Sequence, residues 1–160
     1  MNKYSMFFLY LFLTLTSCAW AEKRTIIITN GESRIEFELN DTSVADSLWN
    51  QLPFSAGVEN YGDNEKIFHP TEPLDTSNVQ ENHCPAGTLA YFFPWGNLVM
   101  YYGSAPLYPG LYILGHATLN ADSIKDISGT IDLNRVTEAR QDSQKEKREA
   151  QTGAVQQKKP

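Results

Sequence analysis

Short runs of β-branched and aromatic residues recur between turn signals from residue 25 to residue 134, and this pattern limits the chain to a mainly β fold. Residues 25–29 are β-branched throughout, and the pair Asn30 and Gly31 is typical of a tight hairpin turn. Residues 34–39 then alternate between apolar and charged side chains, as in a strand with one wet face. Further strands are expected at residues 54–58, 66–68, 88–93, 98–102, 111–114 and 129–133.

One clear helix interrupts the strands. Apolar side chains fall at helical spacing from residue 44 to residue 52, Ser43 with Asp46 fits a capping box, and Pro53 ends the segment. Trp49 lies in the apolar stripe and is expected in the core. A second short helix or turn is expected at residues 120–127. Seven or so short strands with one good helix predict a small, closed or nearly closed β-barrel, because closure removes exposed sheet edges.

Residues 1–21 have the pattern of a bacterial-type signal peptide. The apolar run of residues 6–15 follows Lys3 and is too short to span a bilayer core, which needs roughly 20 residues. Residues 19–21 form an A-x-A cleavage site that would release the domain, whereas residues 15–18 resemble a lipobox that would leave a lipid on Cys18. Both alternatives predict an exported protein, periplasmic or extracellular, with a lipoprotein anchor as its only contact with the membrane.

The remaining chain divides into a domain at residues 22–134 and a polar tail at residues 135–160. Residues 25–134 hold 14 Asp and Glu against three Lys and Arg, a net charge of −11, so nucleic acid is not an expected partner. The tail carries a net charge of +3, has no aromatic residue and is expected to be disordered. With Cys18 removed or acylated, Cys84 has no intramolecular disulfide partner, so the core must hold the domain together.

Three segments, taken together, resemble a known family. They are residues 59–67, residues 85–98 and residues 110–115, and the most specific part is Tyr-x-x-Pro-Trp-Gly-Asn-Leu at residues 91–98. These segments resemble the bacterial cyclophilin-like fold family, small domains with the cyclophilin barrel, and the resemblance runs from about residue 25 to residue 134. The resemblance implies a cyclophilin-like barrel and no settled activity, since fold alone does not define function.

The pattern of a true cyclophilin isomerase is incomplete. Such enzymes use an arginine guanidinium beside a hydrophobic proline pocket, and this chain has no arginine between Arg34 and Arg135. Lys66 could supply charge but not the planar guanidinium. The domain is therefore expected to be noncatalytic. The alternative is an atypical peptidyl-prolyl isomerase, or another enzyme that uses Glu59 or Glu65 as a base.

No other catalytic or metal-binding pattern is present in the sequence. His69, His83, Cys84 and His116 do not follow metal-ligand spacing, and there is no nucleophile elbow or phosphate-binding glycine loop. We therefore expect no metal site and no cofactor.

The candidate site is inferred from the many aromatic residues in the segment 91–112. Eight aromatic residues fall in this segment, and only alternate side chains of a strand can fill a barrel interior. Some of Phe92, Trp95, Tyr101 and Tyr108 are therefore expected at the surface or at a rim, where rings beside a few polar groups form a binding groove. Asn97 could instead cap a turn. The tentative ligand-binding residues, for an unidentified small molecule or peptide favoured by positive charge, are Glu59, Tyr61, Glu65, Lys66, Trp95 and Asn97.

Overall fold

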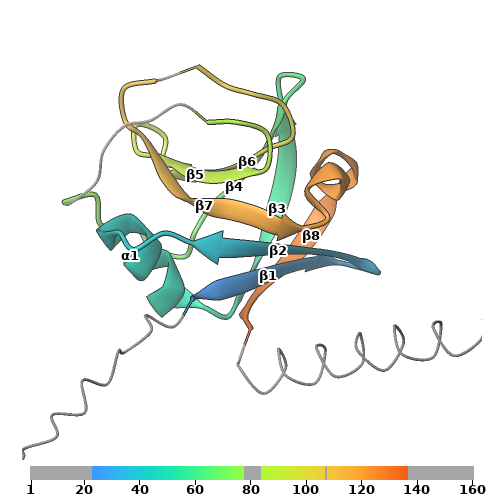
Figure 1. Ribbon diagram of the computed structural model, residues 1–160, viewed down its shortest axis with the longest axis horizontal. Coiled ribbons are helices and arrows are strands. Elements are labelled where there is room, and N and C mark those ends of the chain that lie inside the picture. Colours follow the sequence, from blue (N-terminus) through green and yellow to red (C-terminus); the bar gives the residue numbers. More distant parts are fainter. Residues whose placement is uncertain (1–22, 78–83, 107, 137–160) are drawn as a thin grey trace, which may run out of the picture.

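The computed structural model of the chain describes residues 23–77, 84–106 and 108–136 (Figure 1). The predicted signal peptide, its Cys18, His83 and residues 137–160 of the predicted tail lie outside these residues. Within the described part of the chain, no helix has the length and apolar character needed to cross a membrane.

Eight antiparallel strands close into a barrel, in the order β1-β2-β7-β5-β6-β4-β3-β8. The predicted mainly β, closed barrel with one or two short helices is therefore confirmed. The strands are β1 (Thr25–Asn30), β2 (Ser33–Leu39), β3 (Phe54–Tyr61), β4 (Glu65–Phe68), β5 (Thr88–Phe92), β6 (Asn97–Tyr101), β7 (Leu111–Leu119) and β8 (Gly129–Arg135). The helices are α1 (Ser43–Gln51) and the single 3₁₀ helix η1 (Ala121–Asp126).

Several element boundaries differ from the sequence-based predictions. β3 runs on to Tyr61 and β7 to Leu119, because the barrel supplies pairing partners for backbone that the local pattern assigns to loops. The N-cap of α1 is Thr42, whose hydroxyl accepts a hydrogen bond from the Ala45 amide. Ser43, the predicted cap, is the first helical residue, so the predicted capping box is wrong by one position.

The main core fills the barrel interior. Alternate side chains of the strands point inward, including Ile26 and Ile28 of β1, Phe37 of β2 and Leu133 of β8, all fully buried. α1 and η1 lie at opposite ends of the barrel and contribute apolar side chains to the same cluster (Figure 1). Trp49 packs against this cluster, as the sequence predicts.

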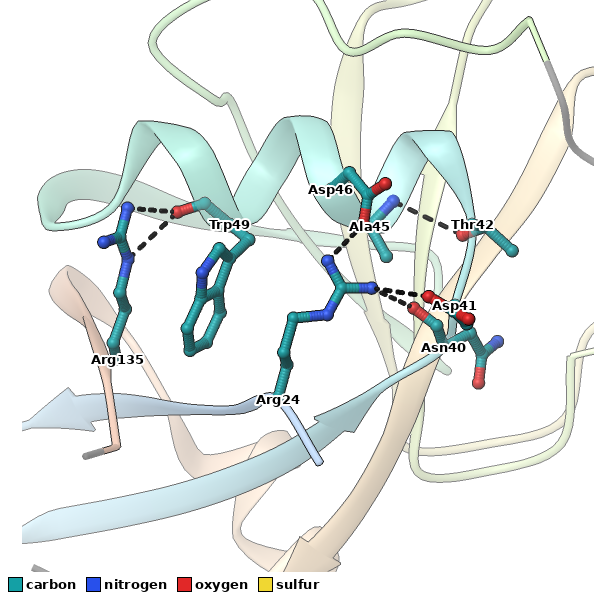
Figure 2. A network of polar contacts seen from close by, with 8 residues as sticks. All are labelled: Arg24, Asn40, Asp41, Thr42, Ala45, Asp46, Trp49 and Arg135. Atoms are coloured by element: carbon teal, nitrogen blue, oxygen red, sulfur yellow. Dashed lines mark hydrogen bonds and ion pairs between the residues drawn. The ribbon is translucent and has the colours of Figure 1, made fainter. Parts of the chain in front are cut away.

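Two arginines, Arg24 directly before β1 and Arg135 at the end of β8, contact α1 (Figure 2). Arg24 pairs with Asp46 in the first turn and donates to the backbone oxygen of Asn40 at 2.9 Å. Arg135 donates from Nε and Nη2 to the backbone oxygen of Trp49, at 3.1 and 2.7 Å, and its guanidinium carbon lies 5.1 Å from the Trp49 ring centre. The same carbonyl accepts a long backbone bond of 3.4 Å from the Leu52 amide, so the guanidinium adds two charged donors at the C-terminal end of the helix.

A second apolar cluster lies on the outside of the barrel. Ala90, Val99 and Leu111 face outward from β5, β6 and β7, and they pack with Cys84 and Ala105. Cys84 and Ala105 form an isolated antiparallel bridge outside the named strands. The segments around Cys84 and Ala105 therefore cover part of the outer wall centred on β6 and shield it from water. The candidate site opens beside this cover.

Candidate functional site

A pocket of about 200 Å³ opens on the outer wall of the barrel, over β4, β5, β6 and the start of β7. It is lined by Tyr61, Glu65, Ile67, Phe92, Trp95, Asn97, Val99, Tyr101, Tyr108 and Leu111. In the closed sheet order, β6 is the strand opposite β1. The pocket therefore lies on the wall across the barrel from β1, where the described chain begins and where Val136 bonds to Thr25.

Strand register builds the floor of the pocket. Asn97, Val99 and Tyr101 alternate along β6 and share its outer face. Across the β4–β6 pairing, Glu65 lies opposite Tyr101 and Ile67 lies opposite Val99. The floor is thus apolar in the middle, with the carboxylate of Glu65 near one end and the amide of Asn97 at the other.

Aromatic rings form one side of the pocket. The rings of Tyr61 and Trp95 meet edge to face, with centres 5.2 Å apart and planes at 82°. Phe92 and Trp95 meet in the same manner, at 5.4 Å and 75°. Tyr61 is 45% exposed and Trp95 54% exposed, so both rings present surface to a ligand.

Glu65 is the carboxylate of this pocket. It lies between two tyrosines, opposite Tyr61 on β3 and opposite Tyr101 on β6. Within the residues that the structure describes, its carboxylate accepts no hydrogen bond and forms no ion pair. Burial raises the pKa of Glu65, because removal of water disfavours the charged form.

The neighbouring ionisable groups are acids as well. Burial, and then the negative charge of Glu65, raise the pKa of Cys84 to about 11. Burial first, and Glu65 second, also raise the pKa of Tyr101. Among the described lining residues there is no lysine or arginine. The site is therefore suited to a positive group and poorly suited to an anion.

Asn97 is a buried amide in the pocket wall. The residue is 1% exposed, and its Oδ1 has no hydrogen-bond partner among the described residues. Its Nδ2 makes a long contact of 3.4 Å to the backbone oxygen of Leu98. This geometry differs from the turn-capping alternative, in which the side-chain oxygen would accept from turn backbone.

The six predicted site residues do not all meet. Tyr61, Glu65, Trp95 and Asn97 line the one pocket. Glu59 is exposed on β3, opposite Ile67, and lies outside the lining. Lys66 points into the barrel, is 4% exposed and donates from Nζ to the backbone oxygen of Ile127 at 2.7 Å.

The position of Lys66 follows from the pleat of β4. Its neighbours Glu65 and Ile67 face the pocket, so the residue between them must face the interior. Lys66 therefore provides no charge to the outer wall.

The sequence patterns do not indicate that Ile67, Val99 and Leu111 line the site. All five residues of β6 are buried, so this strand lacks the apolar–polar alternation that identifies an outward face. Phe92, Trp95, Tyr101 and Tyr108, of which some are expected at the surface or at a rim, do line the pocket, although Tyr101 is buried there.

The remaining reactive side chains stand apart from one another. His69 Nδ1 lies 3.3 Å from the backbone oxygen of Gly96, and His116 Nδ1 lies 3.4 Å from the Thr88 hydroxyl. No group of three or more His, Cys, Asp or Glu side chains gathers at metal-binding distance within the described residues.

Comparisons with known proteins agree with this architecture. A model of the cyclophilin-like family matches residues 28–135. The fold is also similar to the solution structure of a hypothetical protein from Archaeoglobus fulgidus, with a TM-score of 0.58 and 15% sequence identity over 71% of this chain and 95% of that chain. At this identity the likeness concerns the fold alone. No curated protein sequence matches the chain significantly. Because the family model spans more than half of the sequence and all but the first residues of the barrel, the chain belongs to the cyclophilin-like family.

Proposed function

We propose that this protein is a noncatalytic binding module that holds a small molecule, or a peptide side chain, through a positively charged group in the outer pocket. The observation that carries the proposal is the Glu65 carboxylate, which is partly buried and has no partner among the described residues. Loss of hydration without a compensating partner is costly, so a cation supplied from outside would offset that cost.

The rings beside Glu65 support the same ligand class. A cation next to the face of a tyrosine or tryptophan gains roughly 0.5–2 kcal/mol from the ring quadrupole, with the larger values at desolvated sites. Tyr61 and Tyr101 flank the carboxylate, and Trp95 contacts Tyr61. The ligand therefore gains both charge pairing and aromatic contact at one position.

The rival function is an enzyme, either an atypical isomerase or one with a carboxylate base. One observation favours it, because the raised pKa of Glu65 suits a general base. The described lining lacks the guanidinium on which cyclophilin isomerisation depends. A proline-isomerisation assay on the protein separates the two functions: we expect no rate above background, and a rate that Glu65→Gln abolishes would favour the enzyme.

We further propose that the domain works outside the cytoplasm, released by cleavage after Ala21 or anchored through Cys18. The mass of the mature N-terminus tests this proposal. A chain that still begins at Met1 in the export-competent host would contradict it.

The binding proposal is tested by thermal unfolding with matched cationic, neutral and anionic aromatic probes. A cationic probe at ten times its Kd should raise Tm by about 5 °C, and the other two should not. Glu65→Gln should abolish the shift and Trp95→Ala should reduce it. Glu32→Gln, which removes the same charge at the exposed β1–β2 turn, is the matched control and should keep it. Equal shifts with the anionic probe, or none with any probe, would refute the proposal.

A further inference from the structure

Two hydrogen-bond acceptors in the pocket have no donor among the residues that the structure describes. One is the Glu65 carboxylate, and the other is Oδ1 of Asn97, which is shielded from water. A buried acceptor without a partner is rare in native proteins, because it forfeits its hydration without replacement. Since both acceptors belong to the lining of one pocket, a single ligand could satisfy both.

The two acceptors lie toward opposite ends of the floor. Glu65 is in register with Tyr101, and Asn97 is four residues away from Tyr101 along β6, which corresponds to about 13 Å of strand. The floor between them is the apolar pair Ile67 and Val99. At this spacing, one compact cation cannot contact both Glu65 and Asn97. The apolar floor between them favours a ligand with hydrocarbon between two polar ends.

We propose that the pocket takes an elongated aliphatic amine, with an N–H-bearing cation on Glu65, a second N–H donor on Asn97 and hydrocarbon across Ile67 and Val99. The inference rests on the proposed cation-binding function and names its ligand class. Linear diamines are the simplest members. A quaternary ammonium has no N–H and would leave both acceptors unpaired.

Pairing at Asn97 brings specificity as well as affinity. Its Oδ1 is buried without a partner among the described residues, so a donor that reaches it pairs an acceptor that the fold leaves unsatisfied. Trp95, 54% exposed at the β5–β6 turn, lines the same pocket as Asn97 and offers a ring surface to the ligand.

Calorimetric titration of the full chain with linear diamines, from diaminobutane to diaminodecane, tests the inference. Monoamines of equal chain length are the matched ligands. We expect diamine affinity to pass through an optimum with length, and the best diamine to bind about tenfold more tightly than its monoamine. The trimethylammonium form of that monoamine should bind more weakly than the primary amine.

Variants assign the two ends of the ligand. Asn97→Leu should remove the preference for the diamine and keep monoamine binding, whereas Glu65→Gln should weaken both ligands. Asn97→Asp, which places a second carboxylate at the far end, should increase the preference above that of the wild type. Asn97→Leu should also unfold at the same temperature as the wild type or higher, since the unpaired acceptor is gone.

The titrations distinguish the two-ended ligand from the cation-binding function on which it rests. If monoamines bind and no diamine binds better at any length, the two-ended ligand is refuted and the cation site stands. If no amine binds, both are refuted. A lower Tm in Asn97→Leu together with an unchanged diamine preference would assign Asn97 to the fold and would overturn its proposed role.

Discussion

Glu65 is a residue whose position costs the folded protein stability. Its carboxylate loses water on folding and gains no partner among the described residues, while Tyr101 and Cys84 beside it are acids as well. The interior of the same barrel avoids this situation, since Lys66 is hydrogen-bonded to the backbone oxygen of Ile127. This unsatisfied group on the outer wall is the observation on which the proposed ligand rests.

The raised pKa of Glu65 predicts a pH dependence of stability. A carboxyl group that holds its proton more tightly when folded favours the folded state below its unfolded pKa of about 4.5, and this contribution is lost as pH rises through the raised folded pKa. Burial and the nearby Glu65 raise the pKa of both Tyr101 and Cys84, so these two acids stay protonated in that range. We therefore expect the free energy of unfolding of the wild type to fall, relative to Glu65→Gln, above pH 4.5.

Urea unfolding of both proteins from pH 3 to pH 8 measures this difference, with Glu32→Gln as the charge-matched control. A difference that stays constant over the whole range, or that changes sign in the other direction, would show that Glu65 is paired in solution.

Cys84 provides a second prediction at the scale of a residue. Its pKa, raised from 9.0 to about 11, lowers the thiolate fraction near neutral pH about a hundredfold, and burial blocks the reagent further. In a Cys18→Ser background, Cys84 should react with a thiol reagent at least about a hundredfold more slowly in the folded protein than in denaturant. Comparable rates in the two states would mean that the outer cover over β5 and β6 opens readily.

At the scale of elements, the site depends on a strand that is buried on both faces. Side chains of β6 at positions 98 and 100 enter the main core, whereas those at 97, 99 and 101 meet the outer cluster or the pocket. The outer cover consists of segments on either side of β5 and β6, joined at the Cys84–Ala105 bridge. Both the burial of β6 and the cover over it depend on residues that are distant in the sequence. They therefore form only when the sheet closes.

Gly115 lies where β7 comes close to the backbone of β2. It pairs with Leu39 of β2 and with Leu89 of β5, and both pairings contain a register shift nearby. A Cβ at this position would lie 2.2 Å from the backbone oxygen of Glu38, so the strands would have to separate. We expect Gly115→Ala to destabilise the protein by about 3 kcal/mol.

Gly57 in β3 is the control for this substitution, because nothing lies within 4 Å of a Cβ added there. Gly57→Ala should be neutral or slightly stabilising in the same urea titration. Equal stabilities of the two variants would show that β2 and β7 approach less closely than the structure indicates.

At the scale of the whole molecule, the last strand extends past the boundary that the sequence suggests. β8 includes Arg135, and the amide of the buried Val136 donates to the backbone oxygen of Thr25 at 2.8 Å. Arg135 also holds the carbonyl of Trp49 at the end of α1 (Figure 2). The fold therefore includes Arg135 and Val136, the first two residues of the segment that composition assigns to the tail, because composition does not reveal which polar residue closes a barrel.

A comparison of two fragments tests that boundary. A chain of residues 23–136 should unfold at the same urea concentration as the full chain. A chain of residues 23–134 should lose about 2–3 kcal/mol, from the burial of Val136 and the charged hydrogen bonds of Arg135. Equal stability of the two fragments would mean that neither residue contributes to the fold.

The sequence by itself determined the mainly β class, the closed barrel, the helix that Pro53 follows and the surplus of aromatic rings near Trp95. These features are local, since the alternation of side chains, turn residues and helical spacing are all readable within about ten residues. The same local patterns indicated Tyr61, Glu65, Trp95 and Asn97 as candidate residues, because polar and aromatic side chains stand out between apolar strand segments.

Only the tertiary structure decided which of these residues share a pocket. The register of β4 against β6 put Glu65 on the outer wall and Lys66 inside, although the two are adjacent in the sequence. The sequence did not reveal the floor residues Ile67 and Val99, because the sheet is covered on both faces in their region and shows no apolar–polar alternation there. Pairing between distant strands sets the side on which each residue lies, and a shift of one residue would exchange the two sides.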